Sequence, residues 1–254
     1  MDFEISLFSV LLLAGAGYLA GFINTIAGGG SMLTLPAFMM LGVPADVANG
    51  TNRVGILLQS LAGTRGFHRA GKLAPSTVVP TLIPTLAGSL VGSLLASYLP
   101  VTWLKPALLG TMIAMALLML MQPSVIAPPP GTPVLTLRER PIAWAGLFGA
   151  GLYGGFVQAG VGFILIAALA GGLRYDLVRT HALKMAITAA LTLVALAVFI
   201  AREQVLWIPG LLMAVGTVIG AVTSVKFAIS VPQSVLKWAL FVMVVVSCIG
   251  AYVS

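Results

Sequence analysis

Two positively charged residues lie deep inside long apolar stretches of the sequence. Arg53 occurs in VANGTNRVGILL and Lys184 in VRTHALKMAITA. Each lies about eight residues into its segment, which is about 12 Å along a helix axis, so both would approach the middle of a bilayer. A cation there costs about 2.5–3.5 kcal/mol or more. Two such costs at corresponding positions suggest a shared function.

The apolar segments offer these cations no negatively charged partner. Asp46 and Asp176, near the starts of the same segments, are about two helical turns away, too far for a direct ion pair. The other carboxylates, Asp2, Glu4, Glu139 and Glu203, lie at segment ends or in loops. A small anionic substrate is the simplest missing partner: Arg53 could grip an oxyanion with two hydrogen bonds, and Lys184 would act as a point charge. Alternatively, both cations extend to the interface or bond backbone carbonyls.

Polar side chains accompany both cations and are expected to shape the substrate site. They are Asn49, Thr51 and Asn52 beside Arg53, and His181 and Thr188 beside Lys184. His181 lies three residues before Lys184, on roughly the same helix face. It could carry a coupling proton, or it could only donate a hydrogen bond.

Two glycine-containing breaks interrupt the apolar runs. The first, in FINTIAGGGSMLTLP, holds Asn24, the triplet Gly28, Gly29 and Gly30, and Ser31, which is expected to cap the next helix. The second holds Gln158, Gly160 and Gly162. Irregular backbone at membrane depth is tolerated only where protein or a water-filled cavity surrounds it, and helix N-termini there can bind anions. The alternative is close helix packing at small residues.

The composition indicates a helical membrane protein. Of 254 residues, 59% are hydrophobic and only 7% are charged, and the mean hydropathy is +1.10. A soluble domain carries about 25% charged residues. The long continuous apolar runs exclude a β-barrel, whose strands alternate over about 10 residues. The start, MDFEIS, lacks the basic region of a cleaved signal peptide, so the first segment is expected to remain as a membrane helix.

Segment lengths predict an all-α membrane protein with about eight full transmembrane helices and two short broken ones, since a span needs about 20 residues. The full segments are expected at 5–26, 46–67, 75–98, 102–121, 141–159, 176–200, 205–228 and 233–253. The short ones are expected at 31–42 and 162–173.

The chain reads as two homologous repeats. GFINTIAGGGSMLTLPAF matches YGGFVQAGVGFILIAAL, and WLKPALL matches VLKWALF further along. The repeats are expected at 1–121 and 141–254, joined by a Pro-rich linker at 122–140. Short segments of such repeats are typical of secondary transporters, whose sites lie at the breaks.

Positive charges bear on the topology, because Lys and Arg concentrate on the cytoplasmic side. If the short segments cross the membrane, nine charges share one side: Arg65, Arg69, Lys72, Arg138, Arg140, Arg174, Arg179, Lys226 and Lys237. Lys105 and Arg202 then lie opposite. If the short segments dip in and return, six positive charges lie inside and five outside. The crossing alternative is favoured, which makes the repeats inverted and places both termini outside.

Other classes of function fit the sequence poorly. The net charge of +7 has no extramembrane domain on which to hold a nucleic acid. No His/Cys cluster or midplane carboxylate suggests metal transport, and GGSML is not the G-x-S-x-G of a serine hydrolase. The single cysteine, Cys248, is expected to be a buried apolar residue. We expect neither an enzyme nor a cofactor or metal site.

The first repeat resembles the sulfite exporter TauE/SafE family. The likeness rests on AGFINTIAGGGSMLTLPAFMMLGVPADVANGTNRVGILLQSLAGTRGFHRAGKL, with its Gly-rich break, LG-x-P turn and A-x-x-T-N helix start. The second repeat, with GGFVQAGVGFILIAAL, resembles the second copy in that family. It departs in having Ala168 where the first repeat has Pro36, and His181-Ala182 where the family tends to have a small residue and Thr. The resemblance implies an inner-membrane transporter of sulfite, thiosulfate, sulfonates or related anions.

The sequence therefore predicts a secondary transporter of small anions that works by alternating access between the repeats. An anion channel, a transporter of another organic carboxylate and a membrane scaffold without transport activity remain alternatives. The expected partners are the substrate and the lipid bilayer. A homodimer is also conceivable, since faces such as Gly88/Gly92 could serve dimerisation or internal packing equally well.

Overall fold

The structure is a computed structural model, and it describes residues 6–26, 29–73, 75–121, 128 and 131–227. Every regular element in these residues is helical. In chain order they are α1 (Leu7–Ile26), α2 (Ser31–Met40), α3 (Ala45–Arg69), α4 (Pro75–Tyr98), α5 (Val101–Met121), α6 (Pro141–Phe156), α7 (Val161–Ile166), the π-helical η1 (Ala167–Gly172), α8 (Leu177–Ala201) and α9 (Trp207–Phe227).

These bounds agree with the segments expected from hydropathy. Seven of the eight long segments correspond to α1, α3, α4, α5, α6, α8 and α9, and the short ones to α2 and to α7 with η1. The eighth long segment, 233–253, lies outside the described residues. Among the helices described, α1, α4, α5, α8 and α9 are long and apolar enough to cross a membrane. The part of the chain that the structure describes is thus all-helical, as predicted, with several helices suited to crossing a membrane.

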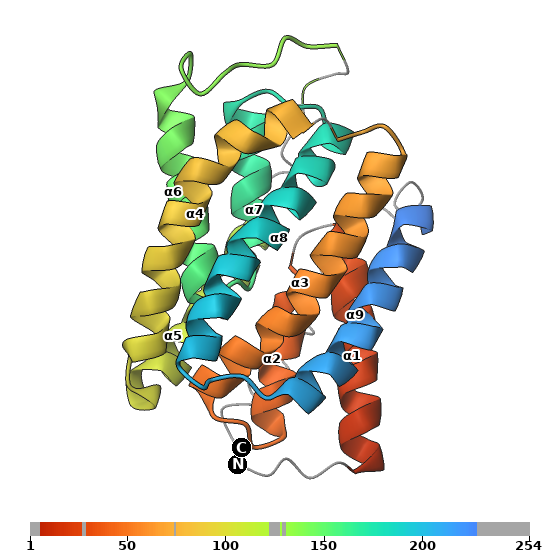
Figure 1. Ribbon diagram of the computed structural model, residues 1–254, viewed down its shortest axis with the longest axis vertical. Helices are drawn as coiled ribbons and strands as arrows, with labels where there is room; N and C mark the ends of the chain where they lie inside the picture. Colours follow the sequence, from red (N-terminus) through yellow and green to blue (C-terminus); the bar gives the residue numbers. More distant parts are fainter. Residues whose placement is uncertain (1–5, 27–28, 74, 122–127, 129–130, 228–254) are drawn as a thin grey trace.

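Helices α3 and α8 pack against each other in the middle of the bundle (Figure 1). On one side α1 packs against α9, and on the other α4 packs against α6. Each of these outer pairs joins one helix from residues 1–121 to one from residues 141–254. The two parts of the chain are therefore interleaved and do not form separate globular units.

Small residues let α4 and α6 approach closely. A Cβ added to Gly92 would lie 2.0 Å from the carbonyl oxygen of Leu152, and one added to Gly155 would lie 2.2 Å from that of Ser89. Gly88 faces α6 in the same way, with Phe148 O at 2.2 Å. Gly88 and Gly92 therefore serve internal packing, and the homodimer stays a prediction that this glycine face does not support.

The α1–α9 pair repeats this arrangement. A Cβ on Gly21 would lie 2.0 Å from the carbonyl oxygen of Thr217, and one on Gly220 would lie 2.1 Å from that of Tyr18. Backbone contact at this distance excludes any larger side chain. Both outer pairs are thus held by glycines on each partner, as in membrane helix packing at small residues.

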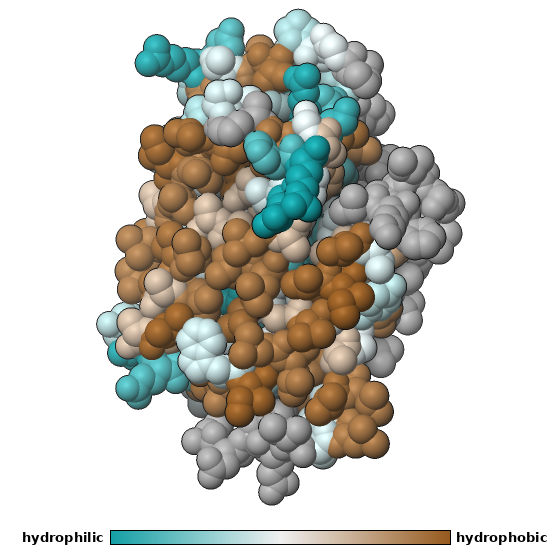
Figure 2. Space-filling model, turned by 45° about the vertical axis from the view of Figure 1, so that its right-hand side comes forward, coloured by the Kyte–Doolittle hydropathy of each residue, from teal (hydrophilic) through white to brown (hydrophobic). Residues whose placement is uncertain are grey.

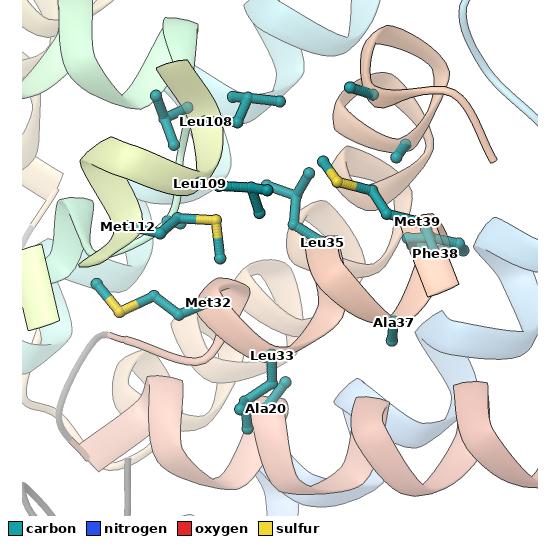
Figure 3. Close-up of a cluster of buried hydrophobic side chains, with 14 of the residues drawn as sticks. Ala20, Met32, Leu33, Leu35, Ala37, Phe38, Met39, Leu108, Leu109 and Met112 are labelled. Carbon is teal, nitrogen blue, oxygen red and sulfur yellow. The ribbon is translucent and has the colours of Figure 1, made fainter. Parts of the chain in front are cut away.

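A buried apolar cluster packs α2 against α5. Met32 and Leu35 of α2 and Leu109 and Met112 of α5 belong to it, and the close-up shows their side chains meeting between the two helices (Figure 3). All of α2 except Met40 is buried. A short helix enclosed in this way is shielded from lipid by the helices around it.

The outer surface suits a bilayer. Large apolar side chains such as Leu11, Ile83 and Leu193 are exposed, and hydrophobic residues form a broad band in Figure 2, with hydrophilic ones gathered towards its upper and lower ends. Water would penalise such a surface, whereas lipid would not.

The two ends of the bundle differ in charge. The C-terminus of α3 and the N-termini of α4, α6 and α8 lie at the upper end of Figure 1. Seven of the nine predicted inside charges lie on or next to these termini: Arg65, Arg69, Lys72, Arg138, Arg140, Arg174 and Arg179. Lys105, near the start of α5, and Arg202, after α8, lie at the opposite end. Lys237 and the side chain of Lys226 lie outside what the structure describes.

The end of α2 bears on whether the short segments cross. Four residues link it to α3, whose first turn lies at the same end of the bundle as the start of α1 (Figure 1). If α2 only dipped into the membrane and returned, α3 would begin at the end of the bundle opposite to the start of α1. The chain order is thus the one that the crossing alternative predicts, and the depth of the short helices in a bilayer stays a prediction.

Candidate functional site

The two buried cations lie on the central helices. Arg53 is the ninth residue of α3 and Lys184 the eighth of α8, and their side chains are 0% and 2% exposed. Asp176 fixes the start of α8 by accepting a hydrogen bond from the backbone N–H of Arg179 at 3.0 Å. Both cations are therefore enclosed in protein.

Arg53 reaches from α3 to the C-terminal end of α6. One terminal nitrogen, Nη1, donates to the carbonyl oxygen of Gly154 and, at 2.7 Å, to Oε1 of Gln158. The other, Nη2, donates to the carbonyl oxygen of Gly155 at 2.7 Å and to Oδ1 of Asn49 at 3.2 Å. The guanidinium also lies 5.3 Å from the ring centroid of Phe199.

These bonds complete the hydrogen bonding of the last turn of α6. The last four carbonyls of a helix have no partner within it. Here Tyr153 O accepts from the backbone of Val157, Gly154 O and Gly155 O accept from Arg53, and Phe156 O accepts from Asn49 Nδ2 at 2.8 Å. A helix can therefore end inside the protein without unpaired carbonyls.

The second break (residues 157–160) has an irregular backbone held by side chains. Gln158 and Gly160 have φ of 69° and 83°, in the left-handed region. The Gln158 amide bridges Arg53 and Thr192, donating to Thr192 Oγ1 at 3.1 Å. The hydroxyl of Tyr153 donates to the Ala159 carbonyl at 2.6 Å. Side chains of α3, α6 and α8 thus fix this segment.

Lys184 makes the corresponding contact at the first break (residues 27–30). Its ammonium group donates to the carbonyl oxygens of Asn24 at 2.9 Å and Thr25 at 3.3 Å, both in the last turn of α1. Each cation therefore belongs to one predicted repeat and bonds the interrupted helix of the other.

The sequence left open whether the cations extend to the interface or bond backbone carbonyls. In the structure both bond backbone carbonyls. Among the described residues the ion pair is Arg179–Asp176, and neither Arg53 nor Lys184 takes part in one. Hydrogen bonds to neutral carbonyls bring no negative charge to either cation. Its role towards a substrate stays a prediction.

The start of α2 differs from expectation. Ser31 was predicted to be the N-cap, but it is the first residue of the helix, and Gly30 precedes it with helical dihedral angles and no side-chain cap bond. A Cβ on Gly30 would lie 1.9 Å from the carbonyl oxygen of Ala20. Because α1 lies against this position, glycine is required there and no capping side chain fits.

The two breaks are neighbours in space. A Cβ on Gly160 would lie 2.4 Å from the terminal methyl group of Met32, in the first turn of α2. Thr34, one turn further, donates to Asn52 Oδ1 of α3 at 2.6 Å. The starts of α2 and α7 and the middle of α3 thus form one region.

Several predicted site residues have other positions or roles. Thr51 accepts from the backbone N–H of Leu206, at the start of α9, and does not join Arg53. Gly162 is buried within α7, and Gly29 accepts from Met32 through its carbonyl. His181 lies in α8 with a buried Nδ1 that has no partner in the described chain. Gly28 lies outside the described residues.

Sequence reasoning missed four contributors: Thr34, Tyr153, Thr192 and Phe199. Thr192 carried a signal, since Thr180, Lys184, Thr188 and Thr192 recur every four residues and are all buried on α8. The others are single residues in apolar helices, and nothing in their local sequence marks them.

Two adjacent residues in the first half of α3 each carry a buried hydrogen-bond donor that lacks an acceptor in the described chain. The donors are Nδ2 of Asn52 and Nε of Arg53. Buried donors are nearly always paired, so each such group calls for an explanation. Chemically, neighbouring N–H donors beside a retained positive charge suit an anion.

Comparison with known proteins adds the family. The model described as sulfite exporter TauE/SafE matches residues 13–251. The chain belongs to this family. The TauE/SafE chain is 29% identical over 234 residues to the probable membrane transporter protein ORF9 of Sinorhizobium, covering 90% of the chain and 86% of that relative.

Other relatives of this TauE/SafE protein have similar names. A probable membrane transporter protein of Haemophilus influenzae is 28% identical over 249 residues, covering 96% of the chain and 93% of the relative. The probable membrane transporter protein YfcA of Escherichia coli is 28% identical over 221 residues, covering 86% and 80%. The TauE/SafE chain is therefore a membrane transporter by family, which agrees with the expectation that it is not an enzyme.

Proposed function

We propose that the chain is a secondary transporter of a small anion, sulfite or a related sulfur-containing or organosulfonate anion, in the inner membrane. Alternating access between residues 1–121 and 141–254 would move the substrate. The family description supports sulfite chemistry, and the excess of arginine and lysine at one end supports a cytoplasmic location for that end.

The observation that carries the proposal is a buried positive charge on α3 beside two hydrogen-bond donors that lack acceptors in the described chain. Arg53 is fully buried and has no ion pair in the described chain. Its Nε and the Nδ2 of the adjacent Asn52 are buried without an acceptor there. An oxyanion supplies both the missing charge and the missing acceptors. Lys184 adds a second buried positive charge, which favours an anion further.

The contacts of the breaks support the remaining predicted site. Gln158 and Asn49 hold Arg53 in position. Gly29 and Gly30 precede α2, and Ser31 is its first residue. The Met32 side chain, in the first turn, reaches Gly160. In this proposal the starts of the short helices offer backbone N–H groups to the anion, while the cations hold the helix ends opposite them.

Crossed contacts also support alternating access between repeats. Arg53 joins residues 1–121 to the end of α6, and Lys184 joins residues 141–254 to the end of α1. A rocking movement would strain these contacts unevenly, so the breaks are where a substrate could be linked to movement.

The test is uptake and release of labelled sulfite in proteoliposomes, with sulfate, thiosulfate and small sulfonates as competitors. The informative variant is Asn52→Asp, which keeps the oxygen that Thr34 bonds and replaces the free donor by a negative oxygen. We expect a loss of at least about tenfold in sulfite flux, equivalent to about 1.4 kcal/mol of binding. Ser224→Ala, which removes another buried group without a partner in the described chain, serves as the control and should transport normally.

Other outcomes distinguish the alternatives. Flux that does not saturate and runs far above carrier rates would indicate a channel, and competition by carboxylates alone would indicate an organic acid substrate. Absence of flux and of competitor binding would reject the substrate class. Normal flux in Asn52→Asp would place the anion elsewhere.

A further inference from the structure

A second polar group lies at the start of α3, about two helical turns before Arg53. Gln204, in the link between α8 and α9, donates through Nε2 to Asp46 Oδ2 and to the carbonyl oxygen of Ser97, both at 3.2 Å. The group thus joins the first turn of α3, the end of α4 and the α8–α9 link.

The orientation of the Gln204 amide is determined by its two acceptors. Ser97 O can only accept a hydrogen bond, so the amide atom beside it must be the nitrogen. The amide oxygen must then occupy the other position. The backbone is also constrained, since a Cβ on Gly50 would lie 2.0 Å from the Gln204 carbonyl oxygen.

This arrangement leaves two buried oxygens without donors. Asp46 Oδ1 and Gln204 Oε1 are both buried and have no hydrogen-bond partner in the described chain. They belong to side chains already joined by one hydrogen bond. A negative charge at the start of a helix is ordinary, but two unpaired oxygens on a facing carboxyl–amide pair are not.

One proton placed between the two side chains would give both oxygens a hydrogen bond. A proton on Asp46 Oδ1 would make that atom a donor, and Gln204 Oε1, on the side chain already bonded to Asp46, is an acceptor without a partner in the described chain. The carboxyl and the amide would then share two antiparallel hydrogen bonds. A metal ion suits the group less well, because Ca²⁺ takes six to eight oxygens and no group of three or more His, Cys, Asp or Glu residues occurs in the part of the chain described.

We propose that Asp46 and Gln204 form the binding site for a proton coupled to anion transport. Asp46 Oδ1 takes the proton from solution at one stage of the cycle, forming an O–H bond, and returns it at another, becoming a carboxylate again. This role rests on the proposed transport function.

The surroundings suit a coupling site. Asp46 and Arg53 share α3, so neutralising the carboxyl changes the field along the helix that carries the anion donors. The other charged groups on the contacting elements are Arg202, which lies over the ring of Tyr98 at 4.1 Å, exposed Glu203, and Lys105 on α5. None of them is ion-paired to Asp46 among the described residues.

The first arm of the test does not require transport. Infrared difference spectra of the purified full-length protein would be recorded while the pH is lowered. The wild type should show the carbonyl band of a newly neutral carboxyl together with a perturbed side-chain amide band. Asp46→Asn should lose both bands. Gln204→Met should lose the amide band and raise the carboxyl frequency, because Oδ2 no longer accepts a hydrogen bond. Glu203→Gln, the exposed neighbour, should keep both.

The second arm measures labelled sulfite flux with and without a pH gradient. A gradient of one pH unit should let the wild type accumulate sulfite by up to about tenfold, since a tenfold proton ratio corresponds to about 1.4 kcal/mol. In Asp46→Asn the gradient should produce no accumulation. The proposal is overturned if the carboxyl band survives Asp46→Asn, if the amide band does not follow it, or if a Na⁺ gradient replaces the pH gradient as the driving force. If sulfite does not move in any variant, the transport proposal fails while the spectra still decide the proton site.

Discussion

The two broken helices of this protein end inside the bundle, and their ends are bonded in different ways. At the second break, Arg53 bonds two consecutive carbonyls of α6 and the side chains of Gln158 and Asn49. At the first break, Lys184 bonds two carbonyls of α1 with a single ammonium group. The same physical problem, unpaired carbonyls in an apolar interior, thus has two chemical solutions.

The difference follows from the geometry of the two cations. A guanidinium is a rigid planar fork that can serve several acceptors in fixed directions, whereas an ammonium is a compact charge on a flexible chain. Arg53 therefore sets the position of the second break within a network. Lys184 neutralises the end of α1 while allowing the acceptors to shift. We infer that the second break is the more rigid of the two.

The largest expected effect is that of Arg53→Lys. A lysine has three donors and cannot serve the four acceptors that Arg53 bonds, so buried carbonyls lose partners. The free energy of unfolding in detergent should fall by about 2–4 kcal/mol, with a large loss of anion flux. Arg65→Lys, an exposed position on the same helix, should change it by less than about 0.5 kcal/mol. Equal stability of the two variants would contradict the fork argument.

A smaller loss is expected for Lys184→Met, which keeps the chain length and removes the charge. Two hydrogen bonds to α1 are lost, and we expect about 1–2 kcal/mol of destabilisation by thermal or denaturant unfolding. Lys105→Met on α5 is the matched control. If Lys184→Met destabilised the protein more than Arg53→Lys, the ranking of the two breaks would be reversed.

Gly160→Ala tests the backbone of the second break alone. With φ at 83°, alanine should cost about 1–2 kcal/mol, since left-handed conformations disfavour a Cβ. The contact with the Met32 methyl group can relax, because that group ends a flexible side chain. Gly149→Ala lies within α6 with open space around it and should instead be neutral or stabilising by about 0.5–1 kcal/mol. Unchanged stability of Gly160→Ala would show that this backbone is not constrained.

The smallest effect is expected at the first break, for Ser31→Ala. An N-cap serine contributes about 1 kcal/mol, but Ser31 lies inside α2 and makes no cap bond. The change in unfolding free energy should stay below about 0.5 kcal/mol. A loss of a full cap energy would restore the N-cap assignment predicted from the sequence.

Much of the fold was predictable because it depends on local composition. Apolar length located α4 at 75–98 without error and placed the other long helices that the structure describes within a few residues. The two short helices were found because glycines interrupt the apolar runs at 28–30 and 160–162. The family followed from the same motifs, and its model matches residues 13–251.

The site was predictable only in part. The sequence marked Arg53, Lys184, Asn49 and Gln158 as unusual in apolar surroundings, and the structure joins three of them directly. It could not indicate that Thr34 would meet Asn52, or that Tyr153 would bond Ala159. These contacts depend on side chains of ordinary type whose partners are set by how the helices pack.

The amino-acid sequence by itself determined that this chain is a helical membrane protein, where its helices lie and which charges they bury, because the cost of exposing polar groups to lipid acts residue by residue. Only the tertiary structure decided what the buried cations contact. Arg53 and Lys184 bond carbonyls about a hundred or more residues away, and local sequence carries no information on which helix end will lie opposite them. That choice belongs to the packing of α3 against α8 and of the outer pairs around them.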